Sequence, residues 1–174
     1  MGWDKYVFGA LLIAAVTHIA CIYAAPRLMM NVAIERVGGE SYNSWRLAER
    51  VSPASRQIVR PSPDFAYSAC AYDLSAGPVT ISAAPWSSYW SLSLYAANSD
   101  NYYVIDDREA EYGAGLTLIR RGARRPDGAA MIVESPSERG IALIRRLAPS
   151  PAEYRAAAET ARRDVCASLA SLAG

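Results

Sequence analysis

Residues 89–96 read YWSLSLYA, and they form the clearest strand pattern in the chain. Trp90, Leu92 and Leu94 alternate with two serines and a tyrosine along this stretch. Because successive side chains of a strand point to opposite faces of a sheet, the alternation predicts a strand with one face in a core.

The neighbouring segments carry similar signals, and turn residues such as Gly, Pro, Asn and Asp separate them. Further strands are expected over residues 66–73, 79–83, 102–105, 116–120, 131–134 and 140–145. No helical pattern connects one strand to the next, which favours antiparallel pairing over parallel βαβ units. We therefore predict a mainly β fold with flanking helices, in which residues 59–148 form an antiparallel β-sandwich-like domain or a barrel.

The longest apolar run, residues 7–25, contains no Lys, Arg, Asp or Glu. A helix over this run is about 28 Å long at about 1.5 Å rise per residue, enough to cross a bilayer. We predict a single-pass transmembrane helix after a short cytoplasmic tail over residues 1–6, with a cleaved signal peptide as the alternative. The length of the run, and Pro26 directly after the best cleavage site, favour the uncleaved anchor. Because long C-terminal domains translocate largely regardless of charge, we expect the domain outside the cytoplasm.

Helical segments are expected on both sides of the β-rich domain. Residues 26–58 form a membrane-proximal segment, with helices predicted over 26–36 and 41–51 before a proline-rich linker. At the other end, residues 149–174 are predicted to form one C-terminal helix packed on the domain. Its start matches a capping box with proline at the first helical position, formed by Ser150, Pro151 and Glu153.

The predicted membrane helix carries a candidate contact face. Ala10, Ala14 and His18 recur every four residues, and small residues on one face allow a neighbouring helix to approach closely. Histidine is costly inside a bilayer, so His18 is a candidate for a polar contact with a partner helix. A haem or pigment ligand, and a neutral imidazole near the interface, are the alternatives.

Composition bounds the remaining chemistry. The net charge is +1 and no basic stripe is present, so a nucleic-acid partner is not expected. Cys21 falls in the apolar run, which leaves Cys70 and Cys166 to form a disulfide outside the cytoplasm or to stay as buried thiols. The only histidine is in the predicted span, so we expect no metal site and no cofactor.

Catalytic motifs are not found: the sequence has no G-x-S-x-G elbow and no histidine in the domain to serve a triad. A pair of carboxylates is the remaining route to catalysis, and the candidates are Asp64, Asp73, Asp106, Asp107 and Glu109. Basic residues that could meet anionic lipid or an acidic partner, or form a solvated loop, are Arg120, Arg121, Arg124 and Arg125. A possible polar pocket at one end of the sandwich would contain Asp64, Tyr67, Asp73, Arg108 and Arg145.

The stretch from Arg60 to Ser68, followed by Asp-Leu-Ser-Ala-Gly-Pro over residues 73–78, resembles a bacterial family catalogued as domain of unknown function 1254. The later strand over residues 89–94, with Arg108, Gly113 and Arg145, is similar to further elements of that family. The resemblance covers about residues 42–172 and implies a β-rich, sandwich-like fold.

The resemblance also implies a partner. Members of this family occur with a companion of the sister family numbered 1214, fused or encoded nearby, and we expect that companion as a separate chain. The sequence departs from the family pattern at Phe65, where the family usually has threonine, and at Ala96 and Ala97, where an acidic residue is usual.

These observations favour a bacterial inner-membrane protein with a periplasmic domain, acting as an accessory subunit that binds the sister chain or a larger membrane complex. An envelope enzyme that uses carboxylates on a polar polymer or glycan is the second hypothesis. A pigment- or haem-associated subunit that uses His18 is the third.

Overall fold

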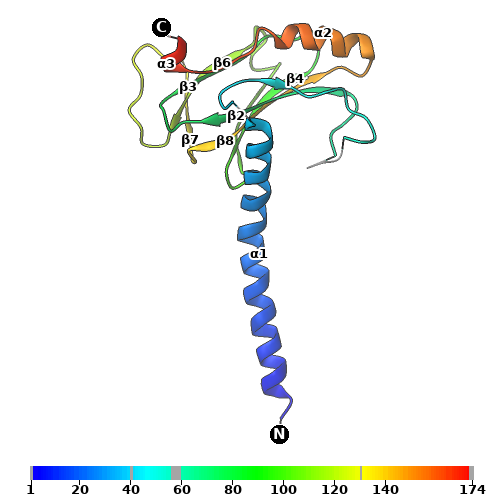
Figure 1. Cartoon of the computed structure of the whole chain (residues 1–174), viewed down its shortest axis with the longest axis vertical. Coiled ribbons are helices and arrows are strands. Elements are labelled where there is room, and N and C mark those ends of the chain that lie inside the picture. The colour runs from blue at the N-terminus through cyan, green and yellow to red at the C-terminus, as the bar shows by residue number, and fades with distance from the viewer. Residues whose placement is uncertain (1, 40, 56–59, 130, 173–174) are drawn as a thin grey trace.

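The computed structural model describes residues 2–39, 41–55, 60–129 and 131–172 (Figure 1). A 35-residue helix, α1 (Asp4–Gly38), projects from one side of a two-sheet domain (Figure 1). The strands are β1 (Arg46–Leu47), β2 (Phe65–Asp73), β3 (Val79–Ala83), β4 (Trp90–Ala96), β5 (Asn101–Asp106), β6 (Ala114–Arg120), β7 (Ile132–Ser135), β8 (Arg139–Leu147) and β9 (Val165–Ser168). Two short helices complete the chain, α2 (Pro151–Ala161) and α3 (Leu169–Leu172).

The strands form a five-stranded sheet in the order β1-β2-β8-β4-β5 and a four-stranded sheet in the order β7-β6-β3-β9. All neighbouring pairs are antiparallel except β6 and β7, which run parallel. The mainly β fold with flanking helices is thus confirmed, whereas the parallel β6–β7 pair departs from the purely antiparallel prediction. The parallel pair is possible because the 11 residues between β6 and β7 are enough to return the chain.

The core lies between the two sheets. Trp90, Leu92 and Leu94 are all fully buried in it, as the alternation in β4 predicts. The other face of β4 is also closed to solvent, since Ser91 and Ser93 are only 1% and 0% exposed. β4 lies between β8 and β5, where Ser91 is in register with Arg145 and Asp106 and Ser93 with Leu143 and Val104.

A disulfide between Cys70 of β2 and Cys166 of β9 joins the two sheets through the core. This confirms the predicted pairing, and Cys21 remains a free, exposed cysteine on α1. Close to the same C-terminal segment, the guanidinium of Arg146 donates two hydrogen bonds of 2.7 and 2.8 Å to the carboxylate of Asp164. Both side chains are almost completely buried, at 2% and 0% exposure. The ion pair therefore fixes the residues that precede β9.

The predicted helix over residues 41–51 is wrong. Gly39 adopts a positive φ of 49° after the end of α1, and Asn43 adopts another of 55°. Arg46 and Leu47 then pair with β2 as a short edge strand. Edge pairing, together with Trp45 packing against the core, outweighs the helical pattern of this stretch.

The predicted single helix over residues 149–174 is also wrong in extent. Its start is confirmed, because Ser150 and Glu153 form the reciprocal capping box of α2. However, α2 ends at Ala161 and the chain continues as β9 and α3. The disulfide at Cys166 and the buried carboxylate of Asp164 hold this segment in the sheet despite its alanine-rich, helix-favouring composition.

The helix α1 runs without interruption through the predicted span and the predicted 26–36 helix. An apolar 18-residue window within it meets the length and hydropathy expected of a membrane span, and none of that window is buried. The last turns of α1 instead pack against the domain, where Ala33 and Ile34 are 8% and 3% exposed. The domain therefore holds one end of α1 and leaves the apolar part projecting (Figure 1).

Candidate functional site

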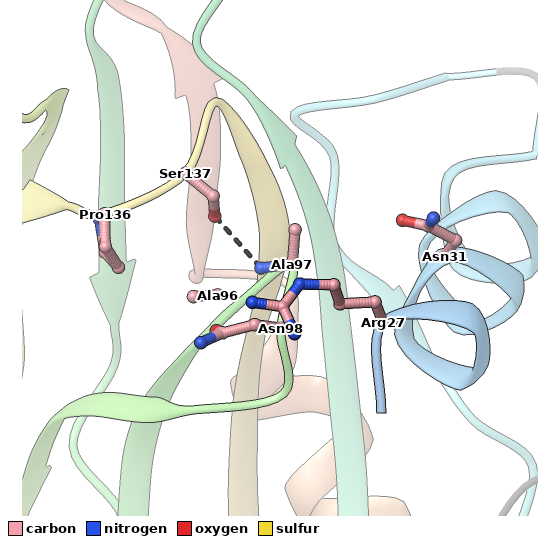
Figure 2. Close-up of a pocket in the computed structure, with 7 residues that line it drawn as sticks. All are labelled: Arg27, Asn31, Ala96, Ala97, Asn98, Pro136 and Ser137. Atoms are coloured by element: carbon pink, nitrogen blue, oxygen red, sulfur yellow. Dashed lines mark hydrogen bonds between the residues drawn. The ribbon is translucent and has the colours of Figure 1, made fainter. Parts of the chain in front are cut away.

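A cleft of about 340 Å³ lies where α1 meets the domain. Arg27 and Asn31 contribute its helix side, and the turn after β4 and the loop before β8 contribute the rest (Figure 2). The lining residues from these two loops are Ala96, Ala97, Asn98, Pro136 and Ser137. The cleft exists only because α1 docks beside the β4–β5 turn, so it combines segments that are far apart in the sequence.

Hydrogen bonds hold the two loops of the cleft together. The Ala97 amide donates to Ser137 Oγ at 3.0 Å, the contact drawn in Figure 2. Ser137 Oγ in turn donates to the Arg139 carbonyl at 2.7 Å, and Ser135 Oγ donates to the Ser137 carbonyl at 2.7 Å. The domain wall of the cleft is therefore tied to β7 and β8 on both sides.

Two tyrosines, the buried Tyr72 and the partly buried Tyr102, are joined to this wall by hydrogen bonds. Tyr72 Oη donates to the Tyr95 carbonyl at 3.1 Å and lies 3.0 Å from Ser135 Oγ. Tyr102 Oη donates to Tyr72 Oη at 3.0 Å. Burial raises the pKa of both tyrosines, so both hydroxyls stay protonated and available as donors in the folded protein.

Arg27 supplies the positive charge of the cleft. Its Nη1 donates to the Tyr23 carbonyl at 2.7 Å, and its guanidinium lies 6.0 Å from the centre of the Tyr23 ring. Figure 2 shows the side chain extending from α1 over Ala97 and Asn98. Beside it, Ser99 Oγ donates to the Pro26 carbonyl at 2.9 Å, which links the β4–β5 turn directly to the helix.

A second set of contacts ties the end of α1 to the domain. Arg139 Nε donates to Asp73 Oδ2 at 2.7 Å, and its guanidinium lies 5.1 Å from the centre of the Tyr42 ring. Tyr42 Oη donates to Glu35 of α1 at 3.1 Å. Burial raises the pKa of Asp73, but hydrogen bonds from Ser75 and Arg139 outweigh it and hold that pKa below its usual value. Asp73 is therefore an ionised part of the junction.

The structure separates Asp73 from the other four residues of the predicted polar pocket. Tyr67 and Arg145 are register partners on β2 and β8, and Arg145 pairs onward with Ser91 of β4. Asp73 lies six residues beyond Tyr67 on the same strand, about 20 Å away at about 3.3 Å per residue. Tyr67 and Arg145 therefore share one end of the sheet, while Asp73 belongs to the helix junction.

The other two members of that set lie near the Tyr67 end. The Asp64 carbonyl accepts from the Ala148 amide at 2.7 Å, just before β2 begins. The Arg108 amide donates to Asp106 Oδ1 at 2.9 Å, and Asp106 pairs with Ser91 of β4. A row of polar residues thus crosses the sheet here, but Ser91 is closed to solvent at 1% exposure.

A two-carboxylate mechanism that uses Asp64 and Asp73 does not fit this geometry. The whole of β2 separates these residues, about 30 Å at about 3.3 Å per residue, whereas the two carboxylates of a glycosidase stand within about 10 Å of each other. Asp106, Asp107 and Glu109 lie together at the turn after β5, where the Glu109 amide donates to the Asp106 carbonyl. This arrangement is that of a hydrogen-bonded turn.

The predicted partner-binding residues lie in two places. Ala10, Ala14 and His18 are exposed on the projecting part of α1. The others lie at the end of β6 and in the loop after it, where Arg120 pairs with Glu138 at 2.9 Å and Arg125 pairs with Glu134 at 3.2 Å. The remaining basic residues of that loop are Arg121 and Arg124, both exposed. Within residues 2–39, 41–55, 60–129 and 131–172, no group of three or more metal-ligating side chains gathers.

Sequence reasoning missed the cleft itself. Asn31, Asn98 and Ser137 carry no motif, and they come together only through the docking of α1. Arg27 gave the one usable signal, because it is the first charged residue after the apolar run.

Residues 42–167 match the family described as "Protein of unknown function (DUF1254)". No curated protein matches the sequence. The fold is similar to that of the VPA0106 protein from Vibrio parahaemolyticus, with a TM-score of 0.67, 15% identity and 89% of this chain covered.

This chain spans 38% of the length of the Vibrio protein. A putative uncharacterized protein from Burkholderia cenocepacia matches with a TM-score of 0.45 and 19% identity over 63% of this chain and 33% of its own. The family match covers well over half of the chain, so the protein belongs to the DUF1254 family.

Proposed function

We propose that this member of the DUF1254 family is a single-pass subunit of the bacterial inner membrane, with its β-sandwich in the periplasm. Its role is to bind a partner chain, for which the sister family numbered 1214 is the candidate. The observation that carries this proposal is the exposed apolar surface of α1, which continues past the end of the span.

The aromatic residues of α1 support the position of the membrane. Trp3 and Tyr6 lie at one end of the apolar run and Tyr23 lies at the other. Tyr6 and Tyr23 are about 26 Å apart along the helix axis at about 1.5 Å per residue. Because Trp and Tyr favour the two membrane interfaces, this spacing suits a bilayer core of about 30 Å.

The disulfide supports an extracytoplasmic domain. Cys70 and Cys166 are bonded inside the core, and structural disulfides form and persist in oxidising compartments such as the periplasm. An N-terminus in the cytoplasm and a sandwich in the periplasm satisfy this requirement.

The surface of α1 beyond the span supports a protein partner. Leu28, Met29 and Val32 remain 64%, 57% and 49% exposed, although they follow Arg27 and lie outside the apolar run. At about 100° per residue, Leu28 lies about 40° around the helix from Ala14 and about 120° from Ile34, which docks on the domain. Large apolar groups that lie beyond the predicted span and that the domain leaves uncovered are typical of an interaction surface.

The test is capture of the full tagged chain from native membranes after crosslinking, with identification of the captured proteins. We expect a stoichiometric companion chain. Ala14→Leu, on the face that Ala14 shares with Ala10 and His18, should reduce its recovery, whereas Ala15→Leu, the same change on a different face of α1, should not. Recovery of the chain without a companion would refute the proposal, and an absorption band in the visible or near infrared would favour the alternative of a pigment or haem at His18.

A further inference from the structure

We propose that the cleft between α1 and the domain binds the phosphate head group of an anionic phospholipid. This inference rests on the proposed membrane anchoring, and it assigns a ligand to a site that partner binding does not use. The proposed ligand is a phosphate ester whose apolar chains extend into the membrane.

The position of the cleft favours a lipid. Arg27 lies one helical turn beyond Tyr23, the residue that marks the membrane interface in the proposed arrangement. The Arg27 side chain turns back and donates to the Tyr23 carbonyl, so its charge is held at the level where head groups lie. A phosphate in the cleft would therefore need no displacement from the bilayer surface.

The polar groups of the cleft suit an anion with several acceptor oxygens. Among the residues that the structure describes, Arg27 donates one hydrogen bond, from one of its five N–H groups to the Tyr23 carbonyl. Asn31 and Asn98 add amide groups to the lining of the cleft. No carboxylate is among the lining residues. In the turn beside the cleft, Asn98 Nδ2 donates to Asp100 Oδ2 at 2.5 Å and Asn98 Oδ1 accepts from the Asp100 amide at 3.3 Å, so Asn98 has one amide hydrogen left for a ligand.

The shape of the cleft is already set. Hydrogen bonds hold both loops in place. The Ala97 amide donates to Ser137 Oγ, and Ser137 Oγ donates to the Arg139 carbonyl. Ser99 Oγ donates to the Pro26 carbonyl of α1. A preformed site loses less conformational entropy on binding than one that must be ordered. With a volume of about 340 Å³, the cleft is large enough for a glycerophosphate head group.

The experiment uses the full chain purified in a non-ionic detergent, titrated with short-chain phosphatidylglycerol and followed by native mass spectrometry. We expect saturable binding that Arg27→Gln weakens about tenfold, the loss expected for one charge-assisted hydrogen bond. Arg27→Lys should retain much of the binding because it keeps the charge. Lys5→Gln, which removes a positive charge at the other end of α1, should leave binding unchanged.

Parallel titrations identify the source of the phosphate. Binding of inorganic phosphate with no gain from the lipid chains would overturn the lipid assignment, as would equal binding of short-chain phosphatidylcholine. Equal lipid binding by the wild type and Arg27→Gln would overturn the site. Fractionation of each variant with membranes is scored separately, so a chain that is anchored but lacks lipid selectivity refutes this inference without touching the proposed anchor.

Discussion

Removal of the disulfide between Cys70 and Cys166 should destabilise the domain strongly. The two cysteines are 96 residues apart in sequence, and both lie in the core between the sheets. The chain-entropy relation gives about 4.7 kcal/mol at 25 °C for a loop of this size. For a domain of this length, that loss corresponds to a fall of roughly 10–20 °C in the melting temperature.

The assay is urea denaturation followed by tryptophan fluorescence, since Trp90 is fully buried and reports on the core. Cys70→Ala, Cys166→Ala and the double variant should lose similar stability, because each breaks the same bond. The Ala variants also leave a small cavity in the core, which costs stability of its own. Wild-type protein reduced with a phosphine lacks the bond but keeps both sulfur atoms, so it measures the loss of the crosslink without that cavity. Cys21→Ser is the matched control, because this cysteine is free and exposed on α1.

A loss below about 1 kcal/mol in both the double variant and the reduced wild type would refute the reasoning. It would mean that the unfolded chain keeps β2 and β9 close without the bond.

Three further predictions concern the domain. Arg146→Met should cost about 3–5 kcal/mol in urea denaturation because it leaves the Asp164 carboxylate buried without its partner, and adding Asp164→Leu should recover part of that loss. Gly140→Ala should cost about 3 kcal/mol or more, since a Cβ there would overlap the Tyr72 hydroxyl and the Tyr95 carbonyl, whereas Gly115→Ala, with open space around it, should be tolerated. Because folding lowers the pKa of Asp73, its carboxylate stabilises the fold fully above about pH 4 and less as the pH falls through the folded-state pKa. Asp73→Asn should therefore flatten the acid side of a plot of unfolding free energy against pH. An unchanged plot would contradict the role of this carboxylate at the junction.

Local pattern was sufficient for much of the sheet. The alternation in β4 and the capping box of α2 act over a few residues, and both appear in the structure as the sequence predicts. Residues 41–51 and 162–168 show the limit of that reasoning. Residues 41–51 have a helical pattern and residues 162–168 lie between alanine-rich stretches, but pairing with β2, the ion pair of Asp164 and the disulfide of Cys166 decide their structure. Those contacts join residues far apart in sequence and leave no local signal.

The cleft illustrates the same limit at the level of function. Its lining comes from α1, the β4–β5 turn and the loop before β8, and no single segment carries a recognisable site. Its helix side depends on the docking of Ala33 and Ile34, while its charge comes from Arg27 at the end of the apolar run. The site therefore requires α1 and the sandwich in one chain. A sandwich expressed without α1 should keep its fold, because its core and disulfide lie within the domain, but it should lose the cleft and with it any lipid selectivity that Arg27 provides.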